Sequence, residues 1–98
     1  MDSKTRAKLR GIANKIDADV IVGKDGITEN VLNQISMNLD AHELVKINVL
    51  SAEEDYKEMI AYVCQKLNAE PIQVVGKKLV IYRFSVKKKN GHVLEDKK

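Results

Sequence analysis

The chain has 98 residues and a mass of 11.0 kDa, which is the size of one domain, so we expect no second domain. A hydrophobic fraction of 44% with 32% charged residues is typical of a globular domain and argues against disorder. The sequence contains no run of about 18 apolar residues, so we expect no membrane-spanning helix. The net charge is only +3, and the single cysteine, Cys64, excludes an internal disulfide and a cysteine-based zinc site.

The first half of the chain is predicted to alternate between helices and a strand. Ser3 is a suitable N-cap for a first helix, in which apolar residues recur at helical spacing as far as Ile16. The β-branched run Val20–Val22 is typical of a buried strand, and Gly23–Gly26 ends it. Thr28 is then predicted to cap a second helix. The buried face of that helix is predicted to comprise Val31, Leu32, Ile35 and Leu39.

A third helix is predicted between strands in the second half. Residues 44–50 alternate as a strand with one fully apolar face. Ser51 and Glu54 form a capping box that predicts the start of the third helix, and Pro71 prevents that helix from continuing. The buried stripe of the third helix is predicted to comprise Tyr56, Met59, Ile60, Val63 and Leu67.

The last elements complete the predicted sheet. Residues 72–75 and 79–84 are predicted to be antiparallel strands joined by a two-residue turn at Gly76–Lys77. The order is therefore α-β-α-β-α-β-β, which predicts a single compact α/β domain over residues 1–85 with a mixed four-stranded sheet. Residues 86–98 are polar and basic, and we expect them to form a flexible tail.

Charge is distributed unevenly along the chain. Residues 1–16 carry a net charge of +4 and residues 77–98 a net charge of +6, whereas the residues between them carry −7. Such segregation favours an electropositive surface built from the two ends, with a polyanion as its natural partner. The alternative is that exposed lysines serve only solubility.

The strongest local motif is Gly23-Lys24-Asp25-Gly26, between the predicted buried strand and the second helix. Two glycines three apart let a ligand approach the backbone closely, and the helix N-terminus behind them offers N–H groups to an anion. A G-x-x-G loop of this kind clamps the nucleic-acid backbone in KH domains. The alternative is a structural turn that needs glycine for positive φ angles. The spacing matches neither a Walker A loop nor a dinucleotide-binding fingerprint.

Four segments together carry a family resemblance. They are Lys8-Leu9-Arg10-Gly11-Ile12-Ala13, Val22-Gly23-Lys24-Asp25-Gly26-Ile27-Thr28, Glu43-Leu44-Val45-Lys46-Ile47 and Val75-Gly76-Lys77-Lys78-Leu79-Val80-Ile81-Tyr82-Arg83. In this order and spacing, over residues 8–83, they resemble the CRM domain family (chloroplast RNA splicing and ribosome maturation), and in particular its free-standing bacterial, YhbY-like members.

The resemblance implies an RNA-binding module with a fold like that of the C-terminal domain of translation initiation factor three. It also implies association with ribosomal RNA in precursors of the large ribosomal subunit. The backbone-clamp role would fall to Gly23, Lys24 and Gly26, and Lys8 and Arg10 match the family's basic first helix, for which phosphate contact is the physical expectation. The further candidates for RNA contact are Lys4, Arg6, Lys15, Asp25 and Arg83.

Two of these expectations concern the shape of the RNA site. The cations of the first helix flank its apolar stripe, and we expect them to join the glycine loop in one surface that reads the RNA backbone. Asp25 departs from the basic character of a KH-type clamp. Its carboxylate could instead cap the following helix or accept a hydrogen bond from a ribose 2′-hydroxyl.

No catalytic constellation is visible, so we expect no enzyme activity, cofactor, metal or small-molecule substrate. Cys64 falls beside the apolar stripe of the third helix and is expected to be a small buried residue, and His42 has no nearby partner that would orient it as a base. Base stacking is not expected to be the main mode of RNA recognition. Tyr82 and Phe84 alternate to one face of the last strand, where we expect them to pack in the core.

The predicted function is that of a cytoplasmic, monomeric RNA-binding protein of large-subunit assembly, without a membrane partner. The alternative is a ribosome-associated protein-interaction module whose basic ends contact protein partners, with RNA contact incidental. The two differ in whether naked RNA suffices for binding.

Overall fold

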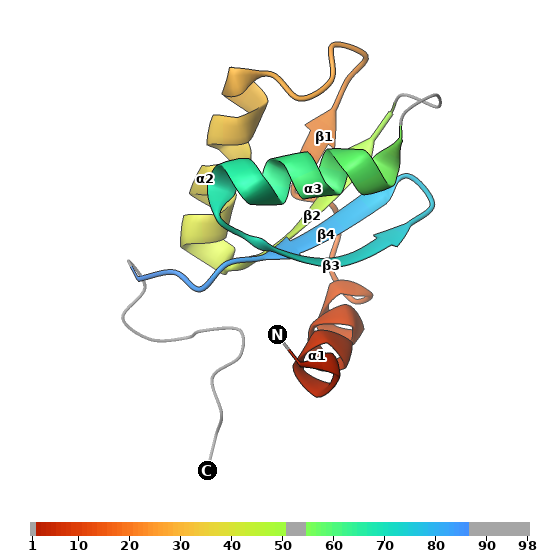
Figure 1. Ribbon diagram of the computed structural model, residues 1–98, viewed down its shortest axis with the longest axis vertical. Helices are drawn as coiled ribbons and strands as arrows, with labels where there is room; N and C mark the ends of the chain where they lie inside the picture. Colours follow the sequence, from red (N-terminus) through yellow and green to blue (C-terminus); the bar gives the residue numbers. More distant parts are fainter. Residues whose placement is uncertain (1, 51–54, 87–98) are drawn as a thin grey trace.

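The computed structural model describes residues 2–50 and 55–86, which form three helices and one four-stranded sheet (Figure 1). The elements are α1 (Ser3–Ala13), β1 (Val20–Val22), α2 (Glu29–His42), β2 (Leu44–Val49), α3 (Tyr56–Leu67), β3 (Glu70–Val75) and β4 (Lys78–Tyr82). Their order confirms the predicted α-β-α-β-α-β-β arrangement. None of the helices in this part of the chain is long and apolar enough to cross a membrane.

The sheet is mixed, as predicted, and has the strand order β1-β2-β4-β3. β1 and β2 are parallel because α2 carries the chain back between them, and the other two pairs are antiparallel. At the β3–β4 turn, Val75 pairs with Lys78, and Gly76 adopts a φ of +57°, which confirms the predicted two-residue hairpin with glycine in its first position.

Helices cover both faces of the sheet. α2 and α3 lie on one face, and α1 lies on the other (Figure 1). The larger core, between the sheet and α2 and α3, includes Ile35, Leu39 and Val63, all fully buried. The smaller core lies under α1, where Leu9 and Ala13 pack against apolar side chains of β2, β3 and β4. Both layers follow from strand alternation, which sends successive side chains to opposite faces.

One helix start differs from the prediction, and the residues predicted to start another are not described. α1 is capped by Asp2 rather than by Ser3, because the Asp2 carboxylate accepts the Thr5 N–H at 2.8 Å and its negative charge suits the helix N-terminus. The Ser51–Glu54 capping box lies outside the described residues. The described α3 begins at Tyr56 and is capped by Asp55, whose carboxylate accepts the Glu58 N–H at 3.1 Å.

The last two strands also differ from the prediction. β3 starts earlier, at Glu70, and includes Pro71, which is tolerated because β3 is an edge strand with a register irregularity between Pro71 and Gln73. β4 ends at Tyr82, so the expectation that Phe84 packs in the core is wrong. Tyr82 is buried, whereas Phe84, beyond the end of the ladder, is 55% exposed.

Candidate nucleic-acid interface

The Gly23–Gly26 loop is a tight turn at the carboxyl end of β1. The Gly26 N–H donates to the Gly23 carbonyl at 3.1 Å, which places Lys24 and Asp25 at the exposed corner. Gly26 has a φ of +76°, a conformation that favours glycine, so the structural reading of the motif accounts for this position. Asp25 does not cap α2, because Thr28 does so by accepting the Val31 N–H at 3.2 Å.

Gly23 is different from Gly26. Its φ lies outside the left-handed region, and a Cβ built on it meets no atom of the chain within 4 Å. Neither backbone strain nor packing among the described residues therefore requires glycine at position 23. Gly23 is exposed, directly follows the buried end of β1 and directly precedes the turn at Lys24 and Asp25 that leads toward α2. Such a position allows an anionic ligand to approach the main chain closely.

Two lysines of the β3–β4 turn lie at the same end of the sheet as this loop. The Leu50 N–H donates to the Val22 carbonyl at 2.9 Å, and the Val49 N–H donates to the Lys77 carbonyl at 2.8 Å. Val22, Val49 and Lys77 thus lie side by side across the sheet, and two strand spacings separate the outer pair by about 10 Å. Lys77 and Lys78 are both exposed.

Lys77 and Lys78 were not among the site residues expected from the sequence. They belong to one of the segments that carry the family resemblance, but only the sheet order reveals that their turn neighbours the β1–α2 loop. Their position would follow from two strand pairings: β1 pairs with β2, and β4 of the hairpin pairs with the other edge of β2. Strand alternation also places Lys78 on the face that α1 covers, because Val80 and Tyr82 belong to the α1 core.

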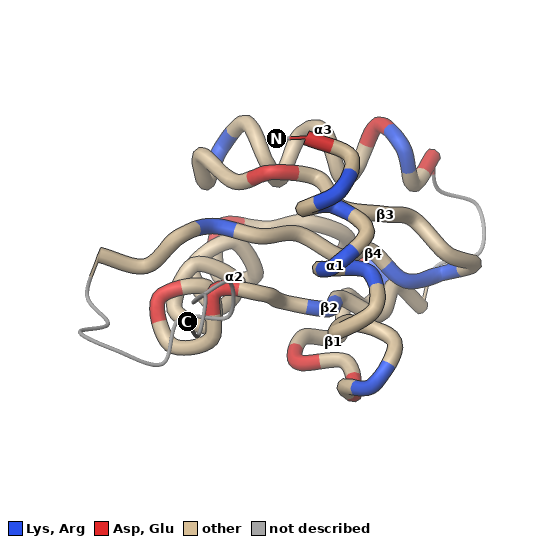
Figure 2. Tube along the Cα trace, turned by 90° about the horizontal axis from the view of Figure 1, so that it is seen from below, with Lys and Arg blue, Asp and Glu red and all other residues tan. Residues whose placement is uncertain are grey.

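The structure does not place the glycine loop and α1 side by side, so the expected single surface of these two elements is not formed directly. Figure 1 shows the β1–α2 loop at the opposite end of the domain from α1. Figure 2 shows α1 crossing the sheet, with basic residues along it and at the start of β4. The candidates Lys4, Lys8 and Arg10 of α1 and Lys15, which follows this helix, are exposed, and the Arg6 guanidinium donates to the Pro71 carbonyl.

Arg83 lies at the other end of β4 and uses its donors within the chain. Its guanidinium donates to the Leu67 carbonyl at 2.8 Å, to the Ser36 carbonyl and hydroxyl at 3.1 Å each, and to the Asp40 carboxylate at 3.0 Å. These bonds tie the end of β4 to α2 and to the end of α3. Only 21% of the Arg83 side chain is exposed.

The two side chains considered for catalysis, Cys64 and His42, lie on α3 and α2 respectively. Cys64 is buried, as predicted, and burial raises the pKa of its thiol to about 12, with a further contribution from Glu70. A thiol with this pKa is protonated at neutral pH and is a poor nucleophile. His42 is the last residue of α2. In residues 2–50 and 55–86, no group of three or more His, Cys, Asp or Glu side chains could hold a metal ion.

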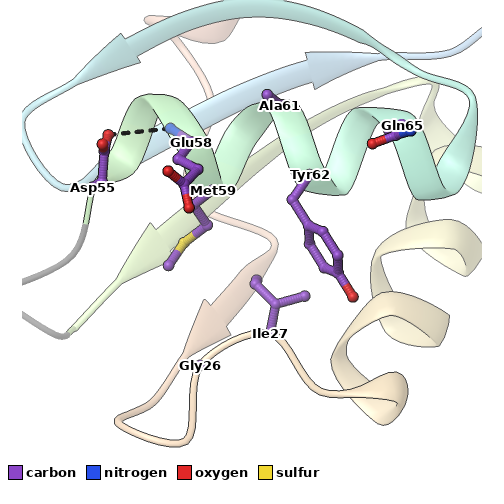
Figure 3. Close-up of a pocket in the computed structure, with 8 residues that line it drawn as sticks. All are labelled: Gly26, Ile27, Asp55, Glu58, Met59, Ala61, Tyr62 and Gln65. Atoms are coloured by element: carbon purple, nitrogen blue, oxygen red, sulfur yellow. Dashed lines mark hydrogen bonds between the residues drawn. The ribbon is translucent and has the colours of Figure 1, made fainter.

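A pocket of about 490 Å³ opens beside the glycine loop, and sequence reasoning did not find it. It lies between Gly26 and Ile27 on one side and α3 with its cap Asp55 on the other (Figure 3). Met59 and Tyr62 project from α3 toward Ile27, and Glu58 lies at the rim. The pocket joins two segments some 30 residues apart, so neither sequence pattern alone predicts it.

Comparison with known proteins identifies the family. Residues 1–83 match the model of the CRS1/YhbY (CRM) domain. A Haemophilus influenzae protein named "RNA-binding protein" is 34% identical over 86 residues, which cover 87% of each chain. "Probable RNA-binding protein YqeI" of Bacillus subtilis is 30% identical over 90 residues, which cover 91% of this chain and 94% of that protein. The solution structure of protein SAV1595 from Staphylococcus aureus superposes with a TM-score of 0.80 at 37% identity, over 93% of this chain and 94% of that one. The chain therefore belongs to the CRS1/YhbY (CRM) domain family, as the four sequence segments indicated.

Proposed function

We propose that this protein binds structured ribosomal RNA in precursors of the large ribosomal subunit and holds its backbone at the Gly23–Gly26 loop. Two relatives that align over most of their length are named as RNA-binding proteins, which supports RNA as the partner. The loop assignment depends on Gly23. Neither the backbone conformation nor the packing of the described residues requires glycine there, whereas a phosphate bound to the main chain would occupy the space that a side chain would fill.

The loop would hold a phosphate by its main chain. The N–H groups near the start of α2 and the positive end of that helix favour an anion, and Lys24 adds a mobile charge at the corner of the turn. The negative charge of Asp25, in contrast, opposes phosphate binding. In this proposal its carboxylate accepts a hydrogen bond from a ribose 2′-hydroxyl, which would favour RNA over DNA.

Lys77 and Lys78 would extend the contact from the loop toward α1. They lie at the loop end of the sheet, and Lys78 faces the side that α1 covers, so the phosphates of a folded RNA can pass from the loop over the hairpin to the exposed cations of α1. This route replaces the direct loop-to-helix surface that the sequence suggested. Each of Lys8, Arg10, Lys77 and Lys78 would then neutralise about one phosphate.

The experiment is a titration of the purified protein with protein-free large-subunit ribosomal RNA at several salt concentrations. Gly23→Asp adds a negative charge at the loop without backbone strain or steric overlap, so it is a cleaner change than any substitution of Gly26. Asn33→Asp, on the exposed side of α2, adds the same charge away from the loop and is the matched control.

We expect Gly23→Asp to weaken binding at least about tenfold while Asn33→Asp binds nearly as the wild type does. Lys77→Ala should lower the slope of log affinity against log salt by about one. Equal binding by the two aspartate variants would exclude the loop as a clamp. If the wild type does not bind the RNA, the RNA proposal fails and a protein partner becomes the better explanation.

A further inference from the structure

The pocket beside the glycine loop has an aromatic wall and an apolar floor. Tyr62 is 42% exposed although it stands next to Ile27 and the nearly buried Met59 (Figure 3). The Lys66 ammonium lies over one face of the Tyr62 ring, 5.7 Å from its centroid, so a base that stacks on that face displaces this flexible exposed side chain. A half-exposed ring above an apolar floor is a surface on which another flat ring can stack.

The rim of the pocket is acidic. Glu58 is exposed there, and Asp55 stands one helical turn earlier, with one carboxylate oxygen accepting the Glu58 N–H. Carboxylates only accept hydrogen bonds at neutral pH, and they repel phosphates. The charge of the rim therefore favours an uncharged flat group with N–H donors at its edge over an anion.

The pocket is continuous with the loop that we propose to hold the RNA backbone. Gly26 belongs to both, since it closes the Gly23–Gly26 turn and lines the pocket. A nucleotide whose phosphate lies on the loop would therefore have its base within reach of Tyr62. Unpaired bases are the part of RNA that proteins recognise by stacking and by hydrogen bonds to their edges.

We propose that this pocket binds one unpaired guanine of the RNA, stacked on Tyr62 and hydrogen-bonded to Glu58. The inference rests on the proposed function. Guanine presents two adjacent donors, its ring N1–H and its amino group, which match the two oxygens of one carboxylate. Adenine and cytosine place a ring acceptor beside the amino group, and uracil flanks its single N–H with two carbonyl oxygens, so these bases fit Glu58 less well.

The test compares two fluorescently labelled RNA pentamers, UUGUU and UUUUU, by fluorescence anisotropy. We expect the wild type to prefer UUGUU by roughly 5- to 150-fold, the range of one two-point base contact. Glu58→Gln should bring this ratio close to one. Glu29→Gln removes the same charge in the first turn of α2, and this matched control should keep the preference.

Two further variants examine the stacking contact. Tyr62→Ala should weaken UUGUU binding by roughly 5- to 150-fold, and Tyr62→Phe, which keeps the ring, should bind nearly as the wild type does. Circular dichroism melts show whether each variant is folded. An unaltered preference in Glu58→Gln, equal binding of the two pentamers, or no binding of either by a protein that binds ribosomal RNA would overturn the guanine pocket. The backbone proposal is separate, because it fails only if Gly23→Asp leaves ribosomal RNA binding unchanged or if the wild type does not bind that RNA.

Discussion

Replacing Arg83 with methionine should destabilise the fold while leaving RNA affinity intact. Methionine keeps an unbranched apolar stem but removes a guanidinium that donates to Ser36, Leu67 and Asp40. The ion pair with Asp40 is partly exposed, at 21% and 30% of the two side chains, so solvent screens its contribution. Loss of the remaining bonds, made by a charged donor to part-buried carbonyls, gives a cost of about 2–3 kcal/mol.

Urea unfolding followed by circular dichroism measures this cost. With an m-value of about 1–1.5 kcal/mol/M for a domain of this size, the midpoint should fall by roughly 2 M while m is unchanged. Lys77→Met is the matched control, since that exposed lysine makes no such bonds and its loss should alter stability by less than about 0.5 kcal/mol. If Arg83→Met is as stable as the wild type but binds ribosomal RNA poorly, Arg83 contacts RNA and this reasoning is refuted.

Three further outcomes follow from the geometry. Gly26→Ala should destabilise the fold by about 1 kcal/mol because of its positive φ, whereas Gly23→Ala should be neutral or slightly stabilising; equal effects in thermal melts would contradict the loop geometry. Asp55→Ala should cost about 1 kcal/mol through loss of the α3 cap, and an unchanged melt would mean that another residue caps this helix. Burial raises the pKa of Cys64 from 9.0 to about 12, so the unfolded state loses this proton first and stability should fall as pH rises above 9. Cys64→Ala should flatten that part of the profile, measured by urea unfolding between pH 8 and 10.

The element order could be predicted because each element carries its own local signal. The β-branched run of β1, the Thr28 cap of α2 and the Gly76 turn are all set by neighbours in sequence, and the structure confirms them. The helix starts were less certain because acceptable caps repeat nearby. Asp2 precedes Ser3, and Asp55 with Glu58 repeats the pattern of a capping box a few residues after Ser51.

The assembly of the candidate site depended on long-range packing that local signals do not encode. Helical periodicity shows that α1 has a buried face, but not which face of the sheet it covers, so the distance between α1 and the glycine loop was not predictable. The same limit explains why Arg83 stood out while Lys77 did not. Lys77 precedes β4 and Arg83 follows it, and only the strand order shows which end of β4 lies beside the loop.

The unequal size of the two cores has a consequence for how the domain opens. Among the described residues, thirteen buried side chains form the core under α2 and α3, and six form the core under α1, of which only Leu9 and Ala13 come from α1 itself. Lys46 adds hydrogen bonds to the Ala13 and Ile16 carbonyls at 3.1 Å. Even with the partly buried Ile12 and Ile16 and the bond from Arg6 to Pro71, α1 is anchored by fewer buried side chains than the larger core, so we expect its amides to exchange with solvent at a lower free energy than those of β2 and β4. We therefore expect the basic helix to open locally while the sheet keeps the glycine loop in place.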